Sequence, residues 1–393
     1  MKQTILIAGG GIGGITAALV LGRQGHTVVV LEQAAEFGEI GAGIQLGPNI
    51  FRMLEHLGLN EAVSSVAYFP PGLTMRDVVT DETIVRVPLG DVARATYDYP
   101  YGVIYRADLH DVLLNACREL PNVELRASAK VESYVQDKYK VNARLNSGES
   151  LSGTLLIGAD GMWSRVRESI VADGKPLVSG HIAYRAVLKR ADVPAHLWDA
   201  DVRLWGGEKT HLVTYPLRRG ELFNLVAVFH SDKYEEGWNS FGDPGELTSR
   251  FSSACAPVKE LLSRIETWKM WVLCDRDPVK NWSMGRVSLL GDAAHPMLQY
   301  LAQGAGQAIE DSVVLGLAID QFDGDVVGAL QQYAQTRYLR TARVQLTARF
   351  YGGIYHATGV TRELRNHMFQ GGNEAAGFAG LKWMYDGIDP TKL

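Results

Sequence analysis

The pattern of apolar and polar positions at the N-terminus predicts a strand, a helix and a second strand. Residues 2–8 form a short apolar run closed by glycine, which is typical of a buried strand. Residues 15–23 favour a helix with small side chains on the face that meets the sheet. Residues 26–31 include three consecutive valines and predict the second strand. This order is typical of the opening of a parallel α/β fold.

Helical and strand-like stretches continue to alternate further along the chain. Helices are predicted over residues 108–119, 304–320 and 326–350, and strands over 123–126, 130–135, 141–145, 155–157 and 287–290. Between residues 181 and 230 the strands, such as 222–229, become longer and richer in aromatic and β-branched side chains, which indicates a second sheet. We therefore expect an α/β fold: a Rossmann-type domain, an inserted mixed β-sheet domain and C-terminal helices.

The composition is that of an ordinary globular protein and limits the classes of function. Of 393 residues, 46% are hydrophobic and 21% charged, and the formal net charge is −5. Such a charge argues against a nucleic-acid partner. Cys117, Cys255 and Cys274 lie too far apart for a metal cluster or a disulfide framework, so no metal site is expected. No apolar run is long enough to span a membrane, and we expect a cytoplasmic protein.

A glycine-rich turn joins the first predicted strand to the first predicted helix. Gly9, Gly11 and Gly14 satisfy the G-x-G-x-x-G pattern, in which glycine lets backbone N–H groups approach a pyrophosphate at the helix N-terminus. Glu32 ends the second strand, where a carboxylate can bind a ribose hydroxyl. The pattern alone does not distinguish NAD from FAD. The predicted dinucleotide contacts are Gly9, Gly11, Ile12, Gly13, Gly14 and Glu32.

Two more glycine-acid turns follow predicted strands. The first is Gly158-Ala159-Asp160-Gly161. The second begins at Gly291-Asp292 and leads through the glycine-rich residues 303–306 into a helix. The N-terminus of that helix can stabilise negative charge on an electron-rich ring system.

Together these three turns resemble the class A flavoprotein monooxygenases, the aromatic hydroxylase family, over nearly the whole chain. The resemblance implies that Asp292 binds a ribityl hydroxyl of FAD, that Glu32 binds the adenosine ribose, and that Asp160 serves FAD and the nicotinamide cofactor. The remaining FAD contacts that it implies are Gln45, Arg106, Val131, Gly304, Ala305 and Gly306.

The resemblance also gives an expected division of the chain into domains. Three segments, 1–72, 101–178 and 277–324, are expected to form the FAD-binding domain. Residues 73–100 supply strands to the substrate domain, 179–276 form its sheet, and 325–393 form a C-terminal helical region.

The predicted substrate residues come from strand alternation and from a narrower resemblance. His211, Val213 and Tyr215 share one face of a predicted strand. Residues 296–303 resemble the corresponding segment of the 3-hydroxybenzoate 6-hydroxylases, whose substrate phenol lies beside a polar pair that His211 and Gln299 match. The resemblance further implies ring or carboxylate contacts from Tyr101 and Tyr215 and an apolar wall from Leu46. Gly306-Gln307, in contrast, follows the pattern of salicylate hydroxylases.

These resemblances imply an FAD-dependent monooxygenase that uses O2 and NADH, or NADPH, to hydroxylate a small aromatic acid. For 3-hydroxybenzoate, attack para to the hydroxyl gives 2,5-dihydroxybenzoate. His211 is the expected base at the phenol, because imidazole titrates near neutral pH, and Gln299 orients the ring or stabilises the developing dienone. A homodimer is consistent with the family.

Several alternatives remain open at this point. Salicylate 1-hydroxylase and 6-hydroxynicotinate 3-monooxygenase share the cofactor and the reaction type. A flavin-dependent reductase or dehydrogenase would insert no oxygen, and a dinucleotide-binding protein without catalytic activity would share only the fold.

Overall fold

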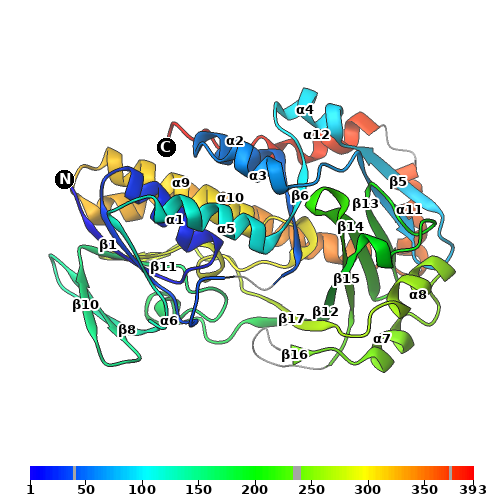
Figure 1. Ribbon diagram of the computed structural model, residues 1–393, viewed down its shortest axis with the longest axis horizontal. Coiled ribbons are helices and arrows are strands. Elements are labelled where there is room, and N and C mark those ends of the chain that lie inside the picture. The colour runs from blue at the N-terminus through cyan, green and yellow to red at the C-terminus, as the bar shows by residue number, and fades with distance from the viewer. Residues whose placement is uncertain (39–40, 233–239, 371–373) are drawn as a thin grey trace.

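The computed structural model describes residues 1–38, 41–232, 240–370 and 374–393. Two large sheets lie towards opposite ends of an elongated molecule, and helices run along it between them (Figure 1). The Rossmann-type unit, the inserted mixed sheet and the C-terminal helices predicted from the sequence are all present.

The first sheet has six strands in the order β18-β19-β11-β1-β2-β7. Pairing is parallel from β19 to β7, and β18 is antiparallel to its neighbour. Helix α1 (Ile12–Arg23) packs against α5 (Arg106–Arg118) and α9 (Gly304–Gln321) beside this sheet. Covered parallel strands need nearly continuous apolar runs, which is the observed pattern. The strands are β1 (Thr4–Ala8), β2 (Thr27–Leu31), β7 (Val123–Arg126), β11 (Leu155–Gly158), β18 (Ser283–Met284) and β19 (Val287–Leu289).

The turn after β1 requires glycine at two positions. Gly9 has φ of 106°, and a Cβ atom there would lie 2.2 Å from the Ala159 carbonyl oxygen. A Cβ atom on Gly14 would lie 2.0 Å from the Gly9 carbonyl oxygen. Glycine thus brings three parts of the fold close together: the turn, the start of α1 and the turn after β11.

The second sheet has eight strands in the order β16-β17-β12-β15-β14-β13-β4-β5. It is mixed, because β13 and β4 pair in parallel while the other neighbours are antiparallel. Helices α7 (Pro244–Arg250) and α8 (Ala256–Ser263) cover its outer face, where Leu212 shares a core with Phe251. The strands are β4 (Gly72–Asp77), β5 (Thr83–Pro88), β12 (Leu177–Lys189), β13 (Val202–Gly207), β14 (Thr210–Leu217), β15 (Leu222–His230), β16 (Ser240–Phe241) and β17 (Lys269–Asp275).

Two small antiparallel sheets complete the strand structure. One pairs β3 (Gly43–Leu46) with β6 (Gly102–Tyr105), and β6 also contacts β14 of the eight-stranded sheet. The other contains β8 (Val131–Gln136), β9 (Val141–Leu145) and β10 (Ser150–Gly153).

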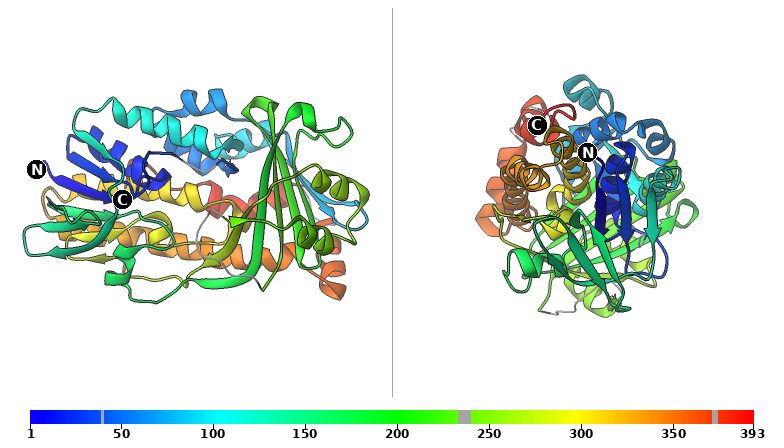
Figure 2. Two further views of the ribbon diagram at one scale, coloured as in Figure 1. Left: turned by 60° about the horizontal axis from the view of Figure 1, so that its bottom comes forward. Right: turned by 90° about the vertical axis from the view of Figure 1, so that its left-hand side faces the viewer.

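The long helix α10 (Val326–Tyr355) connects the two ends of the molecule (Figure 2). It has 30 residues, which corresponds to about 45 Å. It packs along α9, β18 and β19 and ends beside His211 of β14. The helix continues past residue 350, where the sequence prediction ended it.

The other helices are α2 (Pro48–His56), α3 (Asn60–Val66), α4 (Gly90–Tyr97), α6 (Arg165–Ile170), α11 (Gly359–Gln370) and α12 (Glu374–Tyr385). Within the described ranges, no helix combines the length and the apolar character needed to cross a membrane.

Candidate active site

A cavity of about 380 Å³ lies between the inner face of the eight-stranded sheet, strand β3 and the turn that precedes α9. Most of its wall is apolar, and a few polar side chains converge on it, as is usual for a pocket that binds a small organic molecule. Its polar lining residues are Gln45, Tyr101, Arg185, His211, Tyr215, Asp292, Gln299, Tyr300, Tyr351, Tyr355 and Tyr385.

Strand β14 supplies the residues predicted from its alternation. His211, Val213 and Tyr215 all line the cavity, whereas Leu212 points to the opposite face and packs in the outer core. The period-two prediction for this strand is therefore confirmed.

The imidazole of His211 is oriented by a second histidine. Its Nδ1 lies 2.7 Å from Nε2 of His356, the residue that follows α10, and the side chain is only 2% exposed. This leaves Nε2 of His211 for a ligand in the cavity. Burial, and then the neighbouring His356 and His181, hold the pKa of His211 well below its ordinary value. The ring is therefore neutral at neutral pH and keeps an unprotonated nitrogen, but this lowered pKa departs from the near-neutral titration expected from the sequence.

Gln299 lies in the short 3₁₀ helix Gln299–Leu301 and contacts Arg185 of β12. The guanidinium of Arg185 donates a hydrogen bond to Oε1 of Gln299, so the Gln299 amide N–H groups are the ones that remain for a ligand. The same guanidinium lies 5.0 Å from the ring centre of Trp271, and its Nε atom is buried without a hydrogen-bond partner in the described structure. Burial lowers the pKa of Arg185 to about 10, so it keeps its charge at neutral pH.

Arg185 was not predicted as a site residue from the sequence. Among the described residues that line the cavity, it is the only lysine or arginine. A signal was present, because an arginine in the apolar run Ile-Ala-Tyr-Arg-Ala-Val-Leu is unusual for a buried strand unless it has partners.

Two tyrosines lie on the same wall of the cavity as Gln45. The hydroxyl of Tyr101 donates a hydrogen bond to Oε1 of Gln45. Burial raises the pKa of both Tyr101 and Tyr215, so both hydroxyls stay protonated. The single Tyr101 proton goes to Gln45, so the Tyr215 hydroxyl is the one that can donate to an anionic ligand. Gln45, which was expected at the cofactor, is therefore bonded to a residue expected at the substrate.

Leu46 does not have the position expected for it. Its side chain is fully buried in the core around the six-stranded sheet and is not among the cavity-lining residues. The preceding residues Gly43, Ile44 and Gln45 line the cavity instead. The prediction of Leu46 as a pocket wall is corrected accordingly: in the last position of β3, its side chain packs into the core.

The predicted dinucleotide residues come together at the carboxyl ends of β1 and β2. Helix α1 begins after Gly11, where no described side chain caps its first-turn N–H groups. Glu32 accepts hydrogen bonds from the amides of Gly10 and Ala34, at 2.7 and 2.8 Å. Its own carbonyl accepts from the Ala129 amide, two residues before Val131, at 2.8 Å. Glu32 and Val131 are thus brought close together, although about 100 residues separate them in the chain.

A second open helix N-terminus lies at the edge of the cavity. Within the described part of the chain no side chain caps α9 at Gly304, and Gly304, Ala305 and Asp292 all line the cavity. Asp292 is an exposed residue, and burial of its carboxyl group raises the pKa, which His295 and Arg106 at the start of α5 lower in part. Gly306 lies outside the lining: a Cβ atom there would approach Ile50 of α2 to 2.3 Å, so this glycine is needed for helix packing.

Asp160 has a local structural role in the turn after β11. Its carboxylate accepts hydrogen bonds from the Ser164 hydroxyl and from the amides of Arg165 and Val166. These bonds stabilise the start of α6. The carbonyl oxygen of Ala159 lies beside Gly9, so Asp160 is near the turn predicted to bind the dinucleotide. Both oxygens of its carboxylate already accept hydrogen bonds within its own turn.

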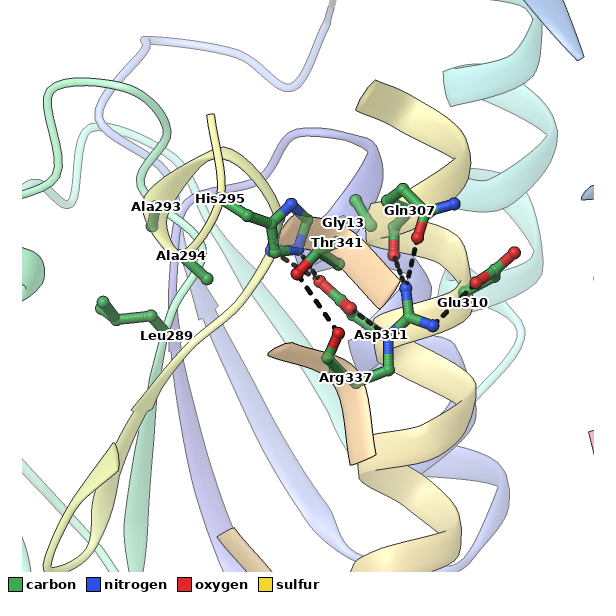
Figure 3. A network of polar contacts seen from close by, with 12 residues as sticks. Gly13, Leu289, Ala293, Ala294, His295, Gln307, Glu310, Asp311, Arg337 and Thr341 are labelled. Carbon is green, nitrogen blue, oxygen red and sulfur yellow. Dashed lines mark hydrogen bonds and ion pairs between the residues drawn. The ribbon is translucent and has the colours of Figure 1, made fainter. Parts of the chain in front are cut away.

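A buried polar network holds the turn that carries Asp292 (Figure 3). The Arg337 guanidinium donates to Asp311, Glu310 and Gln307, each at 2.7 Å. The other carboxylate oxygen of Asp311 accepts from the Gly291 amide at 3.0 Å and lies 2.6 Å from Nε2 of His295. Helices α9 and α10 are thereby tied to the turn.

These features fit FAD. Two uncapped helix N-termini offer backbone donors, one beside Glu32 for a pyrophosphate and one at the cavity for a ring with developing negative charge. Asp292, which lines the cavity beside the start of α9, supplies a carboxylate for a hydroxyl group.

Comparisons with known proteins agree with this assignment. A family model described as an FAD binding domain matches residues 2–346. The chain is 43% identical over 387 residues to 3-hydroxybenzoate 6-hydroxylase 1 of Aquipseudomonas alcaligenes, covering 98% of each protein. It is also 43% identical over 382 residues to 3-hydroxybenzoate 6-hydroxylase of Polaromonas naphthalenivorans, covering 97% of this chain and 95% of that one.

Solved structures share the fold. A salicylate hydroxylase substrate complex matches with a TM-score of 0.83 and 25% identity, over 99% of this chain and 96% of the other. Klebsiella pneumoniae HpxO complexed with FAD and uric acid matches with a TM-score of 0.85 and 24% identity, over 98% of this chain and 96% of the other. Together with the length and identity of the sequence matches, these findings show that the chain belongs to the class A FAD-dependent aromatic hydroxylases, a family of flavoprotein monooxygenases.

Proposed function

We propose that this protein hydroxylates 3-hydroxybenzoate para to its hydroxyl group, giving 2,5-dihydroxybenzoate, with NADH and O2 as co-substrates. One observation carries the proposal: His211 and Gln299 place a proton acceptor and hydrogen-bond donors in an otherwise largely apolar cavity, next to Asp292 and the start of α9. The names of the relatives that are 43% identical support the same substrate.

FAD, held at the glycine turn before α1 and at Asp292, would supply the activated oxygen from O2, with the nicotinamide cofactor as reductant. The residues of this chain prepare the substrate. Nε2 of His211 accepts the phenol proton, which makes the ring more nucleophilic at its para carbon. The Gln299 amide donates to the substrate oxygen and stabilises the carbonyl character that it gains as the ring reacts. The apolar cavity walls exclude water.

We further propose that Arg185 binds the substrate carboxylate, helped by the hydroxyl of Tyr215. Arg185 is the charged donor of the cavity, and its Nε atom lacks a partner among the described residues. A carboxylate can accept two parallel hydrogen bonds from one guanidinium.

The proposed substrate is tested with a panel of hydroxylated benzoates and nicotinates. NADH oxidation, O2 uptake and product formation are measured together, because a compound can trigger NADH oxidation without being hydroxylated. We expect stoichiometric 2,5-dihydroxybenzoate from 3-hydroxybenzoate. If salicylate or 6-hydroxynicotinate is instead hydroxylated in step with NADH oxidation, that compound would replace the proposed substrate. NADH oxidation without any hydroxylated product would contradict oxygen insertion. Repeating the assay with NADPH tests the cofactor preference.

Asp292→Ala is expected to weaken FAD binding by about 10–100-fold, the effect of losing one hydrogen bond to a charged group. The carboxylate is accessible and lines the cavity, so its removal leaves the fold intact. The measurement is the FAD content of purified protein and the Kd for FAD of the apoprotein. Asp243→Ala is the control, because Asp243 caps α7 on the outer side of the eight-stranded sheet. Full FAD retention in Asp292→Ala would contradict the assigned role.

Arg185→Met is expected to raise KM for the aromatic acid by about 10–100-fold, with a smaller effect on the neutral amide of the same compound. The reason is that only the acid loses a charged partner. Arg185→Lys keeps the charge and serves as the matched control, with an intermediate KM. An equal rise in KM for the acid and the amide would mean that Arg185 only positions Gln299 and does not bind the substrate carboxylate.

A further inference from the structure

His211, His356 and His181 form a hydrogen-bonded chain that begins at the cavity. The mechanism proposed above uses only His211. Nδ1 of His211 lies 2.7 Å from Nε2 of His356, and Nδ1 of His356 lies 3.1 Å from Nε2 of His181. Nδ1 of His181 lies 3.3 Å from the Tyr300 hydroxyl. The rings come from β14, from the end of α10 and from β12. The chain therefore connects the cavity to a half-buried part of the protein near the end of β15.

The arrangement of the ring nitrogens suits proton transfer and not metal binding. His356 and His181 each use one nitrogen towards the previous member of the chain and the other towards the next. Each contact therefore pairs an N–H or O–H with a lone pair, and the lone pairs do not converge on one point. In the part of the chain that the structure describes, no group of three or more histidine, cysteine or acidic side chains is placed to hold a metal ion.

We propose that His356 and His181 relay the proton that His211 takes from the substrate phenol, and carry it out of the cavity. The proposal rests on the proposed function, because it requires a phenolic ligand at His211. His356 and His181 act through His211 and are positioning residues for the reaction.

The transfer balances with one proton entering the chain and one leaving it. As the O–H bond of the phenol breaks, its proton joins Nε2 of His211, and the Nδ1 proton of His211 moves to Nε2 of His356. The Nδ1 proton of His356 then moves to Nε2 of His181, whose Nδ1 proton passes to water at the half-buried His181 ring. Each ring ends neutral in its other tautomer. The reverse sequence returns a proton when the product oxygen becomes a phenol again, and restores the starting tautomers.

Burial explains why a relay is needed at this position. A proton left on His211 would be a buried positive charge, which is costly to hold without an anionic partner. Burial lowers the pKa of His356 to about 3 and that of His181 to about 4, with further lowering from neighbouring histidines. Neutral rings that exchange protons with their neighbours avoid the charged state. The other titratable side chains that pack against the three rings are Tyr300, Tyr355 and His230.

The experiment follows the proton directly in the FAD-loaded, oxidised protein. The probe is a nitro-substituted 3-hydroxybenzoate, whose phenol ionises near neutral pH and whose phenolate is coloured. After rapid mixing in weak buffer, phenolate absorbance and proton release to a pH indicator are recorded together. We expect His356→Ala and His181→Ala to slow both signals by about 10²-fold, the lower range for a positioned proton-transfer group, and added imidazole to restore them in His356→Ala.

Two variants separate a relay from a structural contact. His356→Asn retains a side chain able to hydrogen-bond both neighbours but cannot exchange a proton between them, so it should be as slow as His356→Ala while binding the probe with unchanged Kd. His196→Ala is the control, because His196 is exposed and pairs with Glu260 away from the cavity. Wild-type rates in His356→Asn, or no rescue of His356→Ala by imidazole, would overturn the relay.

The same experiment distinguishes failure of the relay from failure of the proposed function. If phenolate forms in the wild-type protein and forms more slowly in the variants, the relay is supported. This holds even if product analysis shows a substrate other than 3-hydroxybenzoate. Equal rates in the wild-type protein and all variants overturn the relay and leave the proposed function standing. A wild-type protein that binds the probe and releases no proton overturns both the relay and the role of His211.

Discussion

His211→Ala is expected to slow hydroxylation by about 10²–10⁴-fold, the usual contribution of a general base. The variant removes the ring nitrogen that the histidine chain presents to the cavity. The turns that we assign to FAD lie on other elements, so FAD content should equal that of the wild-type protein. The measurement is the rate of product formation in single turnover, beside the ratio of product to NADH consumed.

His196→Ala provides the matched control for this prediction. His196 contacts Glu260 near the outer helices of the eight-stranded sheet, and its side chain is 65% exposed. The control should hydroxylate at the wild-type rate. Normal coupled hydroxylation by His211→Ala would exclude the proposed role, whatever the substrate.

Arg337→Met is expected to destabilise the protein by about 3–5 kcal/mol, because it removes a guanidinium that two buried carboxylates share. Arg337, Glu310 and Asp311 are all fully buried, and Arg337 bonds to both acids. The measurement is the free energy of unfolding from denaturant titration. Arg165→Ala, which breaks an exposed ion pair with Glu168, should change it by less than about 1 kcal/mol. A similarly small change in Arg337→Met would contradict the prediction.

The same substitution should make the protein more sensitive to acid. Burial by itself would raise the pKa of Asp311, but His295 and Arg337 outweigh it and hold the pKa at about 2, below the ordinary value of 3.8. The folded state therefore binds fewer protons at this group than the unfolded state. Its stabilising contribution is complete above about pH 4 and is lost as the pH falls towards 2. In Arg337→Met the folded-state pKa of Asp311 lies nearer its ordinary value and this contribution is smaller, so the midpoint of acid unfolding should move to a higher pH.

The fold was largely predictable because its signals are local. The run of residues 2–8, the glycine turn and the valine-rich second strand specify the β-α-β unit within about 30 residues of sequence, and β1, α1 and β2 form at those positions. Residues 326–350 predicted most of α10 by the same reasoning. The end of α10 was missed because the helix stops where it meets Tyr300 and His211, a contact that helical periodicity does not record.

The candidate site was predicted in part. Strand alternation placed His211 and Tyr215 together, and both line the cavity. Leu46 was misplaced, because residues 43–46 form a short strand with neighbours on both faces, and the sequence does not say which face a leucine occupies. Arg185 was missed because its assignment depends on Gln299 and Trp271, more than 80 residues away.

The sequence by itself determined the family, the Rossmann-type unit and the three glycine-acid turns, because glycine is required wherever a backbone must approach another backbone closely. Only the tertiary structure showed which hydrogen bonds the acidic side chains of those turns make and which of them line the cavity. It showed Asp160 bonded within its own turn and Asp292 accessible at the cavity. It also brought His211 into line with His356 and His181, because a 30-residue helix reaches from one sheet to the other. Such contacts depend on how the elements pack, and no spacing along the chain encodes them.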